Sequence, residues 1–287
     1  EILVSSIFNK TQNENVVKID HINLKQIQSE GAINLSDALA TNPGVSVVST
    51  GVSIGKPVIR GLSGNRVLTY AQGIRLENQQ FGEEHGLGLN ANGQESVEII
   101  KGPASLLYGS DAMGGVLYFN PEKYAANNKT ELAINQVVNS NTQGSNSSVT
   151  VKASEDKFKF LVQNNYTTHA DYKTPNGETV VNTRFLEKDF KLGTSFATSR
   201  YVADFRYNYN NLNLGLPEEE IEDSKYRTPL FPSQKIENHL LSFNQKLFFK
   251  NSKLEATAGY VFNDRKELES VEEIALFMKL KTFNYNV

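Results

Sequence analysis

Residues 96–120 read Ser-Val-Glu-Ile-Ile-Lys-Gly-Pro-Ala-Ser-Leu-Leu-Tyr-Gly-Ser-Asp-Ala-Met-Gly-Gly-Val-Leu-Tyr-Phe-Asn, and they are the most informative stretch of the chain. Val97–Ile99 predicts a short strand, which ends before Pro103 because proline has no amide hydrogen for a sheet. Residues 104–108 suit one helical turn, since proline is favoured at a helix start. A second strand is expected at residues 116–119. The stretch therefore predicts a compact strand–turn–strand unit.

Three glycines of this unit have predicted conformational roles. Gly109 is expected to release the helical turn through a positive φ, and Gly114 with Gly115 allows close backbone approach. Three blocks resemble, at matching spacings, the signature near the end of the plug domain of TonB-dependent outer-membrane receptors: Lys101-Gly102-Pro103, Tyr108-Gly109 and Gly114-Gly115-Val116. The resemblance implies an α+β plug domain, in which short helices accompany a small mixed sheet.

The composition narrows the function classes. The formal net charge of −3 gives no indication of nucleic-acid binding, and the absence of cysteine excludes thiolate metal sites and a disulfide scaffold. No apolar run approaches the length of a membrane-spanning helix. The mean hydropathy of −0.41 is that of a soluble protein, but alternating strands hide a lipid-facing surface from such an average.

The first residues allow two interpretations. Composition alone indicates an edge strand or a frayed terminus. In the resembled family, a similar run before the plug is the TonB box, a strand that pairs with the periplasmic energy transducer TonB by strand addition. The residues expected to contact TonB are Glu1, Ile2, Leu3, Val4, Ser5 and Ser6.

Local signals place further plug elements. Strands are expected at residues 16–20, 45–48, 58–61 and 66–70, and helices at 23–29 and 35–40. Asn34 is expected to cap the second helix, with Asp37 at its third position. Gln72 stands where the resembled family usually has aspartate, which we interpret as a changed turn residue.

The periodicity changes after Pro121. Segments of about ten residues alternate between apolar and polar positions, as in Lys157–Tyr166 and Tyr201–Asn210. A lipid-facing strand and a strand of a soluble β-sandwich both show this period of two. The aromatic residues on the apolar faces favour the membrane alternative, because aromatic side chains gather at membrane interfaces.

The resemblance also predicts the domain organisation. Residues 1–12 are expected to hold the TonB box and a periplasmic extension, residues 13–122 the plug, and residues 123–287 antiparallel transmembrane strands. The family barrel has twenty-two strands around the plug. About seven or eight alternating segments are visible, so we expect the barrel to be incomplete in this chain.

The loop after residue 76 carries the main candidate for substrate binding. The family places a plug loop here, facing the extracellular cavity, and the expected substrate contacts are Gln80, Phe81, Glu83, Glu84, His85 and Leu87. Carboxylates beside an imidazole are also ligands that suit zinc and similar ions. The expected metal ligands are therefore His85 and Glu84, extended by His169 and Asp171. The alternative is that these side chains are solvated or packed loop residues.

Two basic residues of the matched motifs have a predicted structural role. In the family, the positions of Arg60 and Lys101 carry side chains that pair with barrel glutamates and hold the plug in place. Lys101 cannot form the two-pronged contact that arginine makes with a carboxylate. The alternative is that both form ordinary surface ion pairs.

The sequence thus predicts an outer-membrane active-transport receptor of a Gram-negative bacterium. Its cargo is expected to be a ferric siderophore, haem, or a metal ion or chelate, and its partners TonB and outer-membrane lipid, with no nucleic acid and no cofactor. Catalytic motifs are missing from the sequence, so it is not expected to be an enzyme. The alternative function is a soluble, plug-like binding or signalling module, which requires a polar outer face on the sheet.

Overall fold

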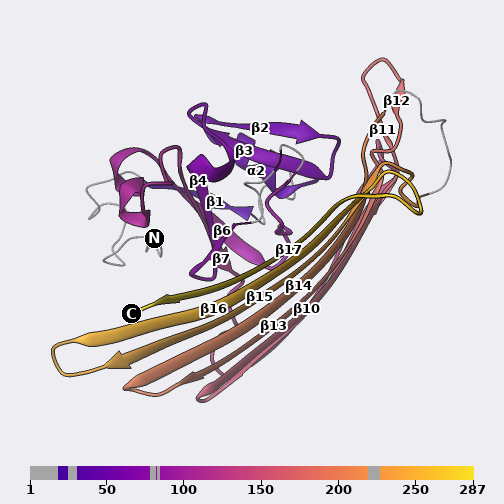
Figure 1. Ribbon diagram of the computed structural model, residues 1–287. Helices are drawn as coiled ribbons and strands as arrows, with labels where there is room; N and C mark the ends of the chain where they lie inside the picture. The colour runs from indigo at the N-terminus through magenta and orange to yellow at the C-terminus, as the bar shows by residue number, and fades with distance from the viewer. Residues whose placement is uncertain (1–18, 25–30, 78–81, 83–84, 219–226) are drawn as a thin grey trace. The chain divides into compact units, whose positions relative to one another are not determined.

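The computed structural model describes residues 19–24, 31–77, 82, 85–218 and 227–287. The chain divides into two units, one formed by residues 1–49 and 54–123, the other by residues 50–53 and 124–287. Each unit has its own sheet (Figure 1).

The first unit is a small α+β domain. Its main sheet has the strand order β1-β6-β7-β4-β5, and it is mixed because β4 pairs with β7 in parallel while the other neighbours are antiparallel. The elements in chain order are β1 (Ile19–Asn23), α2 (Leu35–Ala40), β2 (Val45–Thr50), β3 (Ile54–Ile59), η2 (Gly64–Arg66), β4 (Val67–Ala71), β5 (Ile74–Leu76), β6 (Gln94–Ile100), η3 (Gly102–Tyr108) and β7 (Gly115–Pro121).

The stretch with which the sequence analysis began forms the predicted strand–turn–strand unit, with β6 and β7 joined by the 3₁₀ turn η3. Gly109 has the expected positive φ, at +111°. A Cβ atom on Gly115 would lie 2.7 Å from the carbonyl oxygen of Ile100. The close backbone approach predicted at this glycine is therefore confirmed, and any larger residue would push the two strands apart.

The predicted cap of α2 is also confirmed. The Asn34 side chain accepts a hydrogen bond from the amide of Asp37 at 2.8 Å, and its own amide group donates to the Asp37 carboxylate at 2.8 Å. Burial nevertheless raises the pKa of Asp37, while a hydrogen bond from the Asn34 backbone lowers it to a smaller extent. Residues 16–18 and 25–30 lie outside the described residues, so the first expected strand is seen only as β1 and the first expected helix cannot be compared.

The second unit is an eight-stranded antiparallel sheet with the order β17-β16-β15-β14-β13-β10-β9-β8. The two longest connections, residues 170–184 and 216–232, both lie at one end of the sheet, and the connections at the other end are residues 156–157, 198–200 and 249–252. The strands are β8 (Lys129–Asn139), β9 (Gly144–Glu155), β10 (Phe158–His169), β13 (Phe185–Ala197), β14 (Tyr201–Gly215), β15 (Ser233–Phe248), β16 (Lys253–Leu268) and β17 (Ile274–Asn286), with a small hairpin of β11 (Tyr172–Lys173) and β12 (Thr179–Val180) between β10 and β13.

The faces of this sheet are inverted relative to a soluble protein. On β10, Phe158, Phe160 and Val162 are 52%, 50% and 40% exposed, whereas the alternate residues Gln163 and Asn165 are only 5% and 2% exposed. Apolar side chains outside and polar ones inside are the pattern of a transmembrane β-barrel. The observation agrees with the barrel expectation and argues against a soluble sandwich.

One strand, β13, was not predicted from the sequence. Its first half carries charged side chains on both faces, including Lys188 outside and Asp189 inside, which obscures the alternation. Asp189 is buried, and its carboxylate accepts hydrogen bonds from Asn165 at 3.1 Å and Asn210 at 2.8 Å. Neighbouring strands thus supply the polar contacts that let a charged residue lie within the sheet.

Candidate functional site

The described part of the loop between β5 and β6 packs against β3. The buried Lys56 side chain donates a hydrogen bond to the carbonyl oxygen of Gly82, and the backbone amide of His85 donates to the same oxygen at 3.2 Å. A Cβ atom on Gly86 would lie 3.5 Å from the carbonyl oxygen of Gly55. The backbone of this segment is therefore held along β3 by a lysine and two closely spaced glycines.

Two of the predicted substrate contacts are buried in this arrangement. His85 and Leu87 are each 4% exposed. A Cβ atom at Gly82 would lie 3.1 Å from Nε2 of His85, so the imidazole packs closely on that glycine. Gln80, Phe81, Glu83 and Glu84 lie outside the described residues. The substrate-binding role of this loop, and the metal role of His85 with Glu84, remain predictions.

Lys101 has three polar partners within the first unit. Its ammonium group lies 2.8 Å from the Asp20 carboxylate, 2.7 Å from Oδ1 of Asn42 and 2.6 Å from the carbonyl oxygen of Pro43. An ammonium group has three N–H donors, and these three acceptors match them. Lys101 therefore joins β1, the segment after α2 and the end of β6 within the plug.

Arg60 lies close to the same point. Its amide donates to the carbonyl oxygen of Gly44 at 3.2 Å, and a Cβ atom on Gly102 would lie 3.5 Å from one of its guanidinium nitrogens. A Cβ atom on Gly44 would in turn lie 3.8 Å from Nζ of Lys101. The structure thus brings the two predicted plug-anchoring residues together, with the exposed Arg60 guanidinium more accessible than the Lys101 ammonium. Their contacts with barrel glutamates stay predictions.

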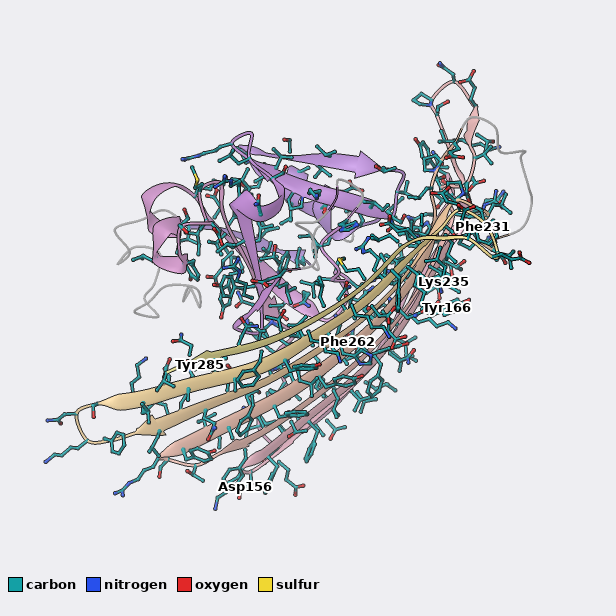
Figure 2. The ribbon with its side chains drawn as sticks, in the orientation of Figure 1. Asp156, Tyr166, Phe231, Lys235, Phe262 and Tyr285 are labelled. Atoms are coloured by element: carbon teal, nitrogen blue, oxygen red, sulfur yellow. The ribbon has the colours of Figure 1, made fainter. Side chains whose placement is uncertain are left out.

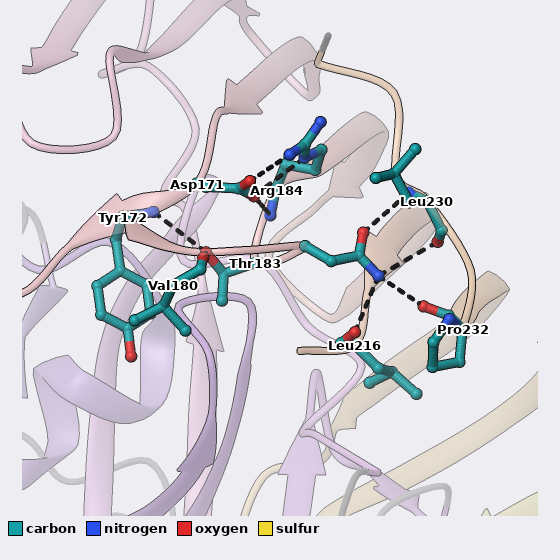
Figure 3. Close-up of polar contacts among 9 residues, drawn as sticks. Asp171, Tyr172, Val180, Thr183, Arg184, Leu216, Leu230 and Pro232 are labelled. Atoms are coloured by element: carbon teal, nitrogen blue, oxygen red, sulfur yellow. Dashed lines mark hydrogen bonds and ion pairs between the residues drawn. The ribbon is translucent and has the colours of Figure 1, made fainter. Parts of the chain in front are cut away.

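In the second unit, Asp171 and Arg184 form a buried ion pair between β10 and β13. One Asp171 oxygen lies 2.9 Å from the Arg184 amide and 3.0 Å from its Nε, and the second oxygen accepts from the terminal guanidinium nitrogen (Figure 3). Both side chains are at most 5% exposed. Both oxygens of the carboxylate therefore accept hydrogen bonds from Arg184, and this ion pair closes the loop that contains β11 and β12.

His169 is also used structurally. Its Nδ1 lies 2.7 Å from the hydroxyl of Thr142, and its ring stacks on Phe185 with the centroids 4.7 Å apart. Within the described parts of the chain, no group of three or more His, Asp or Glu residues is arranged to hold a metal ion. The role of His169 and Asp171 as further metal ligands stays a prediction; in this structure Asp171 is bound by Arg184, and His169 contacts Thr142 and Phe185.

Asn182 connects two loops of the second unit. Its side-chain amide donates to the carbonyl oxygens of Leu216 and Pro232 at 2.8 and 2.9 Å and to that of Leu230 at 3.3 Å, and its Oδ1 accepts from the Leu230 amide at 2.8 Å (Figure 3). The residue is fully buried and has a φ of +62°. One asparagine thereby joins the loop before β13 to the loop between β14 and β15.

The loop between β8 and β9 is also hydrogen-bonded to these two loops. Asn141, between β8 and β9, exchanges hydrogen bonds of 2.8 and 2.7 Å with the backbone of Lys173. Arg227 donates to the carbonyl oxygen of Gln143 at 2.6 Å. We call this end of the sheet the long-loop end. Its loops form a cross-linked rim, whose residues were missed in the sequence because their partners lie up to 84 positions away.

No helix in the described residues has the length and apolar character needed to cross a membrane.

Comparisons with known proteins agree with this architecture. Residues 11–116 match the family described as TonB-dependent Receptor Plug Domain. The chain is 29% identical over 117 residues to the vitamin B12 transporter BtuB of Photobacterium profundum, covering 40% of this chain and 19% of that protein. It is 41% identical over 90 residues to heme/hemopexin utilization protein C of Haemophilus influenzae, covering 31% and 12%.

Structural similarity extends beyond the plug. The siderophore receptor PirA of Acinetobacter baumannii superposes with a TM-score of 0.72 at 15% identity, over 96% of this chain and 45% of that structure. The chain thus spans less than half of the known structure that it matches. These relatives are named as a transporter, a utilization protein and a receptor, not as enzymes. With its plug motifs and its inverted sheet, the chain belongs to the TonB-dependent receptors of the Gram-negative outer membrane, with a plug domain and part of the β-barrel.

Proposed function

We propose that the receptor to which this chain belongs imports a scarce solute into the periplasm with energy delivered by TonB. The observation that carries the proposal is the plug match over residues 11–116, followed by a sheet with its apolar face exposed. A plug inside a barrel blocks free diffusion, so passage requires the plug to be rearranged. The outer membrane has no ATP supply of its own, and the energy therefore has to arrive mechanically from the periplasmic side.

The expected point of force is the segment Glu1–Ser6, which lies outside the described residues. A short strand can pair with an exposed sheet edge of a partner through backbone hydrogen bonds. Tension on that segment would reach β1, the first described strand, which Lys101 connects to the segment after α2. In this proposal the Lys101 contacts are the first to be loaded when TonB pulls.

For the cargo we favour an iron chelate, with haem first. The chain is 41% identical over 90 residues to a protein named for heme/hemopexin utilization, and 29% identical over 117 residues to one named for vitamin B12 transport. A free or chelated divalent metal is less favoured, because one of the two predicted ligand pairs is committed to structural contacts.

Uptake by the intact receptor tests the function. Cells that express it as their one route for haem are expected to accumulate hemin when TonB is present, and to lose this ability when TonB is deleted. Val4→Pro in the expected TonB box should have the same effect, because proline removes a backbone donor from strand pairing. Uptake that continues unchanged without TonB would contradict the energy coupling.

Ligand binding to the purified intact receptor tests which cargo is recognised, independently of energy coupling to TonB. Hemin, a ferric catecholate siderophore, cyanocobalamin and zinc are titrated in detergent, and the Val4→Pro receptor serves as the matched control. Hemin is expected to bind both receptors equally, since the substitution affects force and not the binding surface. Tighter binding of cyanocobalamin than of hemin would overturn the cargo assignment and leave the transport proposal standing.

A further inference from the structure

The outward face of the second unit carries a group of lysines at the long-loop end. We call Lys188, Lys235, Lys266, Lys279 and Lys281 the lysine cluster. They come from β13, β15, β16 and β17, and each occupies an outward position of its strand. The register pairs Lys235 of β15 directly with Lys266 of β16. Four different strands therefore direct positive charge to one part of one face.

Like charges that face one another across two strands repel. The Cβ atoms of such a directly paired couple are about 5 Å apart, so Lys235 and Lys266 hold two ammonium groups within reach of a single anion. The next outward pair in the same register is Glu237 and Asp264. Among the described residues, Asp264 lies 3.4 Å from Lys279, and Glu237 lies 2.9 Å from His239. The two carboxylates thus already have neighbours with which to interact.

A hollow adjoins the paired lysines. It has a volume of about 780 Å³, and its floor is formed by outward residues of the strands, among them Tyr166, Asn213, Lys235 and Lys266. Arg227 and Phe231 of the loop between β14 and β15 form part of its wall. Figure 2 shows Phe231, Lys235 and Tyr166 near the same end of the sheet, with Asp156 at the opposite end. The hollow combines cations, an amide and aromatic rings.

The lysine cluster lies next to the apolar band of the sheet. Along β14, Tyr209, Tyr207, Phe205, Ala203 and Tyr201 all face outward below Asn211, a path of eight residue-to-residue steps or about 27 Å. At the strand tilt of about 40° typical of barrels, this corresponds to roughly 20 Å of membrane thickness. Tyr209 pairs with His239, and His239 with Phe262, so an aromatic row borders the band. Lys188, Lys235, Lys266 and Lys279 lie beyond this row, and Lys281 is level with it, opposite Phe262.

These positions identify the surroundings of the lysine cluster. Barrels of this class have long loops on the outer side of the membrane and short turns on the periplasmic side. Cations directly beyond an aromatic row at the long-loop end therefore lie at the level of the outer-leaflet headgroups. Lysine stems can lie along apolar surface while the ammonium groups reach a polar layer, and three of these lysines already lie over rings, with Lys279 4.9 Å from the Phe277 centroid.

We propose that the lysine cluster, with Arg227, binds the phosphate groups of a phosphorylated lipid of the outer leaflet. Lys235 and Lys266 contact one phosphate between them, Arg227 contacts the headgroup from the loop, and the acyl chains lie on the apolar band. A lipid is favoured over free phosphate because a single outward row, Glu237 with Asp264, separates the paired lysines from the aromatic row of the lipid-facing surface. This site is separate from import, since it faces the bilayer and not the interior of the barrel.

Native mass spectrometry of the intact receptor tests the site. Diphosphoryl lipid A is the probe, and phosphatidylcholine and inorganic phosphate are the comparison ligands. The receptor is expected to bind the diphosphorylated probe at least tenfold more tightly than phosphatidylcholine. Lys235→Gln with Lys266→Gln should weaken probe binding at least fivefold, while Lys235→Arg with Lys266→Arg, which keeps both charges, should retain it.

Lys157→Gln with Lys250→Gln is the matched control, because it removes the same charge from the short turns at the opposite end. This control is expected to change probe binding less than twofold. Equal binding by the Lys235→Gln, Lys266→Gln receptor would overturn the proposal, provided that its melting temperature in detergent is unchanged. Inorganic phosphate that binds the receptor as tightly as the lipid probe would overturn the lipid assignment.

Discussion

The ammonium group of Lys101 and the carboxylate of Asp20 lie 2.8 Å apart and join the end of β6 to β1. Both side chains are largely shielded from water, at 12% and 21% exposure. The contact matters because β1 is the first described strand after the expected TonB box. A force applied at the N-terminal segment would meet this ion pair and the two bonds from Lys101 to Asn42 and Pro43.

Lys101→Met is expected to destabilise β1 by about 1–3 kcal/mol, because it removes the donor that contacts the Asp20 carboxylate and the carbonyl oxygen of Pro43. Hydrogen exchange of the β1 amides in the intact receptor measures this as faster exchange. Lys101→Arg keeps the charge and serves as the control, with a smaller effect. Unchanged exchange in Lys101→Met would show that the contact does not hold β1.

Gly55→Ala is expected to destabilise the plug by about 1–3 kcal/mol through overpacking. The new methyl would lie 2.5 Å from Cβ of Ser36, whose hydroxyl donates to the Gly55 carbonyl oxygen at 2.7 Å. Hydrogen exchange of α2 is the readout. Combining Gly55→Ala with Ser36→Gly restores the space, so this pair should recover part of the protection. Without any recovery, the clash with Ser36 is not the cause.

Gln72→Asn is expected to stabilise the β4–β5 hairpin by about 0.5–1 kcal/mol. Gln72 and Gly73 have φ angles of +56° and +84°, which is the geometry of a two-residue turn that favours Asn-Gly. Gln72→Ala is the contrasting variant and should destabilise the hairpin, because alanine tolerates a positive φ poorly. Equal thermal transitions for both variants of the intact receptor would contradict this account of the turn.

Asn182→Ala is expected to loosen the rim. It removes one acceptor and three donor contacts from a fully buried position, and several kcal/mol of loop stabilisation should be lost. Asn182→Gly keeps the positive φ without strain and isolates the role of the side chain. Limited proteolysis of residues 227–232 provides the measurement. Equal resistance of both variants and the wild type would show that other contacts hold the loops.

Much of the plug could be predicted because its signals are local. The cap of α2 requires Asn34 and Asp37 three positions apart, and the close approach at Gly115 is visible as a glycine between strand patterns. Strand β13 could not be predicted, since its charged residues are stabilised by groups on other strands, as Asp189 is by Asn165 and Asn210. The residues that stabilise such a charge are distant in the sequence, so the sequence alone does not show that they are neighbours.

The same distinction between local signals and distant contacts applies to the candidate sites. The pairing of Asp171 with Arg184 joins residues 13 positions apart with no repeating pattern, so a carboxylate near a histidine was interpreted as a metal ligand. The lysine cluster was missed because the start of β15, from Ser233 to His239, has polar residues on both faces. A register is needed before Lys235 and Lys266 become neighbours.

The inverted faces of β10 have a consequence for assembly. In a soluble protein, folding removes apolar surface from water. In this unit each strand alone is amphiphilic, and a continuous apolar surface exists only after residues such as Phe160 and Val162 align with their counterparts on neighbouring strands. Folding therefore assembles a continuous apolar surface instead of burying one, so folding of the sheet must be coupled to its insertion into lipid. In the unfolded chain the apolar side chains alternate with polar ones and form no continuous apolar surface in water. The bilayer acts as the solvent that favours the native register.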